Sequence, residues 1–162
     1  MILADGLTLA GVDDAPGALV RSIADTLPDG VLAIDGSRAL VFVNQRAEQI
    51  LRSPVSTALG APIRESVPLW DAEGRMWWDV ANPWKALPSV KGHREKLLWT
   101  GDGIEVLATA RYVRSAPRGP VVLVVVALRD ALARQRAERD HAALISTLAH
   151  ELRSPLTSVK GF

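Results

Sequence analysis

The sequence predicts an α+β fold: a five-stranded antiparallel sheet with short flanking helices, followed by a long C-terminal helix. The sheet is predicted by five runs of β-forming residues that are bounded by turn residues. Short helical patterns separate the first two runs from the last three, which favours one sheet with its helices on one face. After the fifth run the chain becomes densely charged and takes on a helical period.

The N-terminal part predicts a tail and then a helix. Residues 1–14 show no clear period and are expected to form the tail. Pro16 suits the first turn of a helix, and the turn signal LPDG at 27–30 ends it. One face of this helix carries the apolar residues Leu19, Val20, Ile23 and Leu27.

A hairpin and a second helix follow. The β-rich runs at 31–35 and 39–44 flank the turn residues GSR, which is typical of a hairpin. Asn44 has a good N-cap side chain for the helix that starts at Gln45. One face of that helix carries Ala47, Ile50 and Leu51.

Residues 61–92 are rich in proline, glycine and tryptophan and are expected to be irregular. Three strands are predicted after them, of which the second alternates between two faces and the third is a buried apolar run. These strands are expected at 93–100, 104–113 and 120–128.

Residues 131–143 are expected to form a charged connector helix. Seven of the twelve residues from 129 to 140 are charged. Arg134 with Glu138, and Arg136 with Asp140, have the spacing of helical ion pairs, which contribute about a few tenths of a kcal/mol each. The start of a longer helix is then predicted at 144–162.

Composition limits the function classes. Apolar residues make up 48% of the 162 residues, which is ample for a core. A net charge of +1 argues against a nucleic-acid-binding face, and the absence of cysteine excludes disulfides, cysteine–zinc sites and cysteine–flavin adducts. The N-terminus lacks the basic start of a signal peptide, and the longest apolar run is too short to span a bilayer. We therefore expect a soluble, cytoplasmic chain, with a membrane segment elsewhere in a longer parent protein left open.

The C-terminal helix carries an apolar stripe and a histidine on another side. Its apolar residues recur at intervals of 3, 4, 4 and 3. His150 lies roughly 150° from this stripe, with Ser154 one turn further on the same side. Pro155 is expected to bend the helix one turn after His150. No second helix in the chain is long enough to cover the stripe, which predicts a homodimer through the C-terminal helices. The stripe consists of Ile145, Leu148, Leu152, Leu156 and Val159.

Tryptophan is concentrated in one short segment, since four of the five lie within fifteen residues. Their rings either cover the open face of the sheet or line a ligand pocket, and we favour the interpretation that they cover the sheet. The adjacent Trp77 and Trp78 are not expected to point into one core together. The candidates for pocket residues are Trp70, Trp77, Trp78, Trp84 and Trp99.

The remaining histidines do not predict a metal site. His141 lies among charged residues and is expected to be solvated, while His93 opens a strand without a second convergent ligand. We therefore expect no metal and no cofactor bound to this chain.

Residues 15–130 resemble a PAS sensor domain. The resemblance rests on LPDGVLAID, on the strand ALVFVN that ends in Asn44, on AEQIL, on Gly60 and on Arg129–Asp130 at the end of the last strand. These motifs are individually weak, and their order and spacing carry the resemblance. It implies a five-stranded sheet and a possible pocket for a small ligand.

The segment STLAHELRSPLTSVKGF resembles the phosphoacceptor box of bacterial sensor histidine kinases. The resemblance implies that His150 attacks the γ-phosphate of ATP and passes the phosphoryl group to an aspartate of a response regulator. Glu151 would accept or orient the proton on the other ring nitrogen. Ser154 stands where the family has Thr or Asn, which puts a phosphatase role in question. ATP, Mg²⁺ and the second helix of the family's hairpin would belong to the full-length parent.

The resemblances together predict the sensory and phosphoacceptor part of a two-component histidine kinase, truncated after the box and inactive alone. The alternative is a non-catalytic PAS module that pairs subunits or binds a small ligand. The sequence HELRSPL favours the kinase, because a pure pairing helix has no reason to carry it.

Overall fold

The computed structural model describes residues 15–160, and the predicted tail at 1–14 lies outside the described residues. The side chains of residues 15–17, 20 and 153–160 lie outside them as well. The chain divides into two compact units, Met1–Asp130 and Ala131–Phe162. The first unit holds a sheet with short helices, and the described part of the second is one helix.

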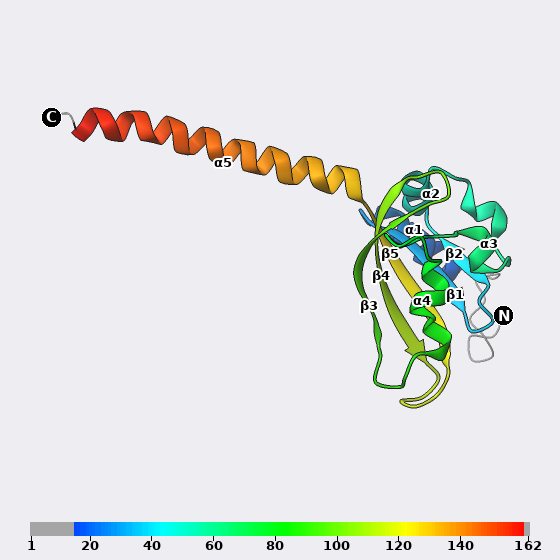
Figure 1. Cartoon of the computed structure of the whole chain (residues 1–162). Coiled ribbons are helices and arrows are strands. Elements are labelled where there is room, and N and C mark those ends of the chain that lie inside the picture. Colours follow the sequence, from blue (N-terminus) through cyan, green and yellow to red (C-terminus); the bar gives the residue numbers. More distant parts are fainter. Residues whose placement is uncertain (1–14, 161–162) are drawn as a thin grey trace. The chain divides into compact units, whose positions relative to one another are not determined.

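The first unit contains the predicted five-stranded antiparallel sheet (Figure 1). Its strands lie in the order β2-β1-β5-β4-β3, and all neighbouring pairs are antiparallel. β1 therefore forms the predicted hairpin with β2 and also pairs along its whole length with β5. The strands are β1 Gly30–Asp35, β2 Leu40–Val43, β3 Gly92–Trp99, β4 Glu105–Arg114 and β5 Val121–Asp130.

Short helices connect the strands, and a long helix follows the last strand directly (Figure 1). The expectation of an irregular segment at 61–92 is wrong in part, because three of the short helices lie in it. Each has five residues or fewer, which is too short to show a helical period in the sequence. The helices are α1 Ala15–Thr26, α2 Gln45–Leu51, η2 Val55–Ala58, α3 Ile63–Ser66, α4 Trp77–Ala81, η3 Pro83–Lys85 and α5 Ala131–Lys160.

The main core lies between one face of the sheet and α2, α3 and α4. β4 alternates between buried and more exposed residues along most of its length, as predicted. Its buried residues join those of β1 and β5 in one cluster, together with the buried side chains of the three helices. The largest fully buried side chains of this cluster are those of Trp77, Trp78, Leu32, Ile34, Leu40, Ile63, Leu69, Leu98 and Leu128.

α1 packs on the other face of the sheet, so the prediction of helices on one face is wrong. Ala33 lies between two residues of the main core along β1, and it packs instead with Ala24 of α1 and Phe42 of β2. The guanidinium of Arg21 lies 5.4 Å from the centre of the Phe42 ring. The sequence could not show this, because the one buried side chain among those described in α1 is an alanine, Ala24.

Asn44 is fully buried and joins four segments of the first unit. Its Oδ1 accepts hydrogen bonds from the backbone N–H groups of Val31, at 2.8 Å, and Ala47, at 2.9 Å. Its Nδ2 donates to the carbonyl oxygens of Ala24 and Asp29, at 2.9 and 3.2 Å. The prediction of an N-cap for α2 is confirmed. The same side chain also ties α1 and the turn after it to β1.

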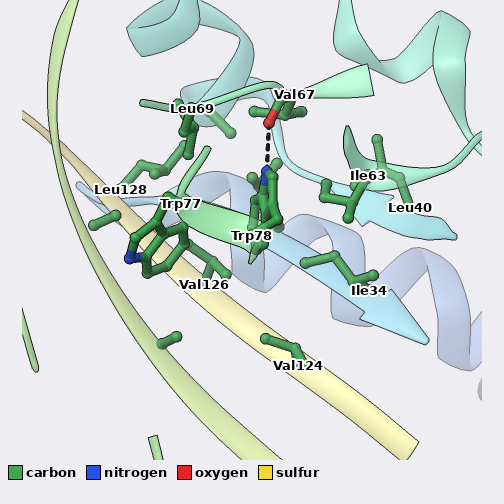
Figure 2. Close-up of a cluster of buried hydrophobic side chains, with 14 of the residues drawn as sticks. Ile34, Leu40, Ile63, Val67, Leu69, Trp77, Trp78, Val124, Val126 and Leu128 are labelled. Atoms are coloured by element: carbon green, nitrogen blue, oxygen red, sulfur yellow. Dashed lines mark hydrogen bonds between the residues drawn. The ribbon is translucent and has the colours of Figure 1, made fainter. Parts of the chain in front are cut away.

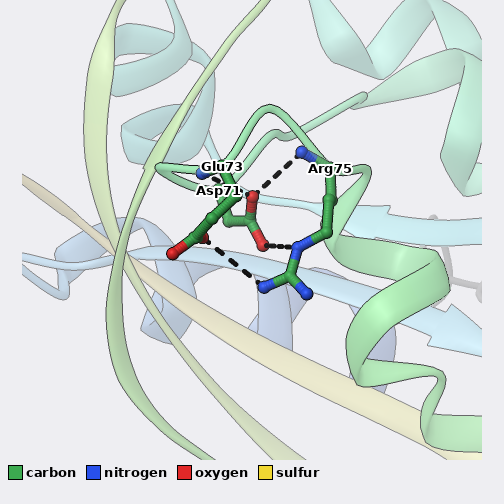
Figure 3. Close-up of polar contacts among 3 residues, drawn as sticks. All are labelled: Asp71, Glu73 and Arg75. Carbon is green, nitrogen blue, oxygen red and sulfur yellow. Dashed lines mark hydrogen bonds and ion pairs between the residues drawn. The ribbon is translucent and has the colours of Figure 1, made fainter.

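Asp71 organises the turn that leads into α4 (Figure 3). Its Oδ1 accepts from the N–H groups of Glu73 and Arg75, at 3.0 and 2.9 Å, and its Oδ2 accepts from Nε of Arg75 at 3.0 Å. The carboxylate is buried, but the hydrogen bond from the Arg75 N–H, supported by the one from Glu73 and by the guanidinium charge, lowers the pKa of Asp71 below its ordinary value. The turn thus depends on the charged form of this side chain.

We expect the Asp71 carboxylate to make the first unit sensitive to acid. Because the pKa of Asp71 is lower in the folded than in the unfolded protein, its ionised carboxylate stabilises the fold. This stabilisation is complete above the pKa of an unfolded aspartate, about 3.9, and is lost as the pH falls through the pKa of the folded state. Urea unfolding at about pH 6 should therefore show Asp71→Asn to be less stable than the wild type, with the difference shrinking by about pH 2.5. The exposed Asp102→Asn, in the β3–β4 turn, is the matched control. A difference between wild type and Asp71→Asn that stays constant with pH would contradict this role.

Candidate functional site

His150 and Glu151 are adjacent, exposed residues of α5. Exposure was predicted for His150 from its place on the helical wheel, and that prediction is confirmed. An exposed imidazole can present a ring nitrogen to an external group, which an attack on that group requires. Ser154 and Pro155 continue the helix, but their side chains lie outside the described residues. The predicted bend at Pro155 therefore stays a prediction.

The apolar stripe of α5 is exposed over its described part. The exposed fractions of its side chains lie between 48% and 62%. Leucine and isoleucine at helical spacing are normally covered in a soluble protein. Leu156 and Val159, the last two residues of the predicted stripe, have side chains outside the described residues. The described side chains of the stripe are those of Ile145, Leu148 and Leu152, and Leu144 beside them is also exposed.

Trp77 and Trp78 both point into the main core (Figure 2). Their exposed fractions are 0% and 2%, so the expectation that they could not share one core is wrong. Both lie at the start of α4, where neighbouring side chains diverge by about 100° rather than pointing to opposite sides as on a strand. The two rings, 4.8 Å apart and tilted by 55°, can therefore enter the same layer between helix and sheet.

The polar ends of these two indoles differ. Nε1 of Trp78 donates a 2.7 Å hydrogen bond to the carbonyl oxygen of Val67 (Figure 2). Nε1 of Trp77 has no partner and is the one buried side-chain nitrogen or oxygen in this condition among the described residues. The Trp77 ring meets the His93 ring edge to face, with centroids 5.6 Å apart. His93 thus has an aromatic contact that its position at the start of a strand did not predict.

The other three tryptophans form one backbone-bonded pair and one single residue. Trp70 and Trp99 pair through their backbones, with both N–H···O distances at 2.9 Å. Trp84 is half-buried, and its Nε1 donates to the carbonyl oxygen of Asp35 at 3.0 Å. The guanidinium of Arg38 lies 5.3 Å from the centre of the Trp84 ring. The arrangement favours tryptophans as cover of the sheet over tryptophans as a ligand cage.

A small surface hollow of about 160 Å³ lies beside the end of α2 and the β3–β4 turn. Its lining includes Leu51, Val55, Val67 and Thr100 but none of the candidate tryptophans. In the part of the chain that the structure describes, no three histidine, aspartate or glutamate side chains come together as a metal site. No helix in that part is long and apolar enough to cross a bilayer.

Sequence reasoning missed two residues, Asp71 and Arg114, that hold parts of residues 61–92 in place. Asp71 could have been found from the sequence DAEGR, because an aspartate followed three residues later by glycine is a turn pattern, and Gly74 has a φ of 75°. Arg114 had no such signal. Its guanidinium donates to the carbonyl oxygens of Ala86 and Gly119, among others, and only the folded structure brings these together.

We expect Trp78→Phe to lower the free energy of unfolding more than Trp77→Phe. Both changes remove the same atoms from one core, but the first also leaves the buried Val67 carbonyl without a donor, which costs about 1–3 kcal/mol. The second removes an N–H that has no partner to lose. Equilibrium urea unfolding of the two variants measures the difference. Equal losses would mean that the Trp77 N–H is also satisfied in solution, for example by a buried water.

Residues 18–85 match the sequence model of a family described as PAS domain. No curated protein matches the chain. Among solved structures, the PAS domain of a Colwellia psychrerythraea protein is 14% identical, with a TM-score of 0.52 over 70% of this chain and 94% of that one. A Rhodobacter sphaeroides LOV protein is also 14% identical, with a TM-score of 0.52 over 74% of this chain and 69% of that one.

A third similar structure is the PAS domain of a LuxR-family transcriptional regulator from Burkholderia thailandensis, in complex with ethanol. It is 12% identical, with a TM-score of 0.50 over 68% of this chain and 95% of that one. Identities this low show a common fold. Residues 18–85 thus match the PAS family model, and the part of the chain that holds the five-stranded sheet has the PAS fold, so we call this part the PAS domain.

Proposed function

We propose that the chain is the sensory and phosphoacceptor part of a two-component histidine kinase. In this proposal the PAS domain receives a signal and controls the phosphorylation of His150, which passes the phosphoryl group to an aspartate of a response regulator. One observation carries it: His150 is exposed on a long helix, directly before an exposed Glu151, in the sequence HELRSPL. That sequence resembles the phosphoacceptor box of the family.

The proposed chemistry is a phosphoryl transfer to a ring nitrogen of His150. The nitrogen attacks the γ-phosphorus of ATP, a P–N bond forms, and the bond to the leaving oxygen of ADP breaks. The new P–N bond leaves a positive charge on the ring, which Glu151 removes by accepting the proton of the other nitrogen or stabilises by orienting that N–H. ATP and Mg²⁺ are held by residues outside this chain in the proposal. Ser154 keeps a hydroxyl where a water could be positioned for the reverse reaction.

A homodimer through α5 is part of the same proposal. The exposed stripe that includes Leu148 and Leu152 needs a cover, and a second copy of the same helix supplies a matching stripe. Leu19 and Ile23 of α1, and Leu27 just after it, are also exposed and would add to the interface, whereas the side chain of Val20 lies outside the described residues. A soluble cytoplasmic location fits this assignment.

The exposed stripe equally favours a second function, a PAS module whose helix only pairs subunits. Such a module needs the stripe but has no use for His150 or Glu151. A possible small ligand of the PAS domain is compatible with both functions. Phosphorylation of His150 therefore separates the two.

We expect the protein that carries this segment to be labelled by radioactive γ-phosphate from ATP at His150. The label should be lost in acid and kept in base, because it is a phosphoramidate. His150→Gln should remove it, whereas His141→Gln, at another exposed histidine of the same helix, should keep it. Label that persists in His150→Gln would refute the assignment, and an unlabelled wild type would support the pairing module.

We expect the chain to be a dimer at micromolar concentration and the double variant Leu148→Glu/Leu152→Glu to be a monomer. Two copies of the variant would place four like charges along the paired helices, which opposes association. Light scattering measures the mass of each. The matched control is Leu59→Glu/Val80→Glu, at two exposed apolar positions of the PAS domain, and it should stay dimeric. A monomeric wild type, or a double variant that remains dimeric, would rule out pairing through this stripe.

A further inference from the structure

Two tight loops lie side by side at the end of the PAS sheet where β4 ends and β5 begins (Figure 1). One loop spans 86–91 and the other 115–120, and we call them together the tip surface. Each is closed by its own turn: the Val90 N–H donates to the Leu87 carbonyl, and the Gly119 N–H donates to the Ala116 carbonyl, both at 2.9 Å. The tip surface is therefore built from rigid turns.

Arg114 joins the two loops. Its Nη1 donates to the carbonyl oxygen of Gly119 at 3.0 Å, and its Nη2 donates to those of Ala86 and Leu87 at 3.1 and 2.9 Å. These acceptors are neutral, so they leave the charge of the guanidinium uncompensated. The bonds fix the tip surface in one arrangement and add a positive charge behind it.

The tip surface exposes apolar side chains to solvent. Leu87 is 70% exposed, more than any other large apolar residue described, and Val90 is 37% exposed. Pro88 and Pro117 are exposed beside them. A shallow hollow of about 520 Å³ lies between the loops. It is lined by Leu87, Pro88, Ser89, Pro117 and Arg118. An exposed leucine held on a rigid turn suits insertion into an apolar phase.

Basic side chains surround these apolar residues. Lys85 and Lys91 flank the first loop, Arg118 lies in the second, and Arg111 pairs with Gly92 beside Lys91. All four are exposed, and none of them makes a side-chain hydrogen bond or ion pair with any described residue. The carboxylate of Asp35, whose backbone carbonyl oxygen accepts from Nε1 of Trp84, accepts at Oδ1 from the N–H groups of Ser37 and Ala39 in its own turn. The tip surface thus has a local positive charge in a chain whose net charge is +1.

We propose that the tip surface docks the protein onto anionic lipid membranes. The four basic side chains attract the negatively charged headgroups, and Leu87 with Val90 enters the boundary between headgroups and acyl chains. Charge and insertion act together, because neither a few lysines nor one leucine alone gives stable membrane binding. The proposal is independent of the role of His150.

The size of the tip surface favours a lipid surface over an acidic protein. A stable protein interface needs roughly 800 Å² on each partner, with a fully buried apolar centre. Two short loops with a leucine, a valine and two prolines offer much less. A membrane requires only a few inserted side chains and a positive ring, and the tip surface presents both.

Sedimentation with vesicles tests the proposal on the whole chain. Vesicles of about 30% phosphatidylserine in phosphatidylcholine should bind it at least about tenfold more tightly than pure phosphatidylcholine at about 50 mM salt, and about 500 mM salt should remove the difference. Leu87→Ser and Lys91→Gln/Arg118→Gln should each weaken binding several-fold. Circular dichroism and urea unfolding establish that the variants are folded.

Matched control variants test whether vesicle binding depends on the tip surface or on exposed leucine and basic side chains in general. Leu59→Ser removes another exposed leucine of the PAS domain, and Arg136→Gln/Arg139→Gln removes the same charge from α5. Both controls should bind vesicles like the wild type. The proposal is wrong if the wild type shows no preference for phosphatidylserine, or if the controls lose as much binding as the tip variants. Retention on polyglutamate beads that depends on Lys91 and Arg118, without vesicle binding, would reassign the surface to an acidic protein.

Discussion

The buried amide of Asn44 is the contact on which the arrangement of the PAS domain depends. Its four hydrogen bonds connect α1, the turn before β1, β1 itself and the start of α2. Only an amide has two acceptor sites on one atom and two donors on the other in a side chain of this size. The helix on one face of the sheet and the helix on the opposite face are therefore fixed by the same residue.

Two indoles fill part of the interior of the domain. Trp77 and Trp78 occupy the layer between α4 and the sheet, and the Asp71 turn delivers the chain to that helix. A small molecule entering this layer would have to displace an indole. Within this layer the N–H of Trp77 has no hydrogen-bond partner among the described residues.

Local sequence patterns predicted most of the fold, because the strands alternate or run apolar and the turns carry glycine and proline. The Asn44 cap and the exposure of His150 followed from local geometry in the same way. What could not be predicted depends on contacts between distant segments. α1 packs on the second face through Ala24, a residue with no pattern of its own, and Trp77 and Trp78 share a core because α4 is a short helix rather than a strand. The hydrogen bonds from Arg114 to the two loops likewise join segments that are distant in the sequence.

The pairing of β1 with β5 has a consequence for how the protein is made. β1 lies between β2 and β5, so a strand from the start of the domain completes its hydrogen bonding only with the last strand. During synthesis the β1–β2 hairpin must wait, with one edge open, until residues 121–130 have left the ribosome. Sheets that join distant segments fold slowly, and open strand edges invite aggregation in the meantime. The nascent chain therefore exposes an aggregation-prone strand edge that the finished domain no longer has.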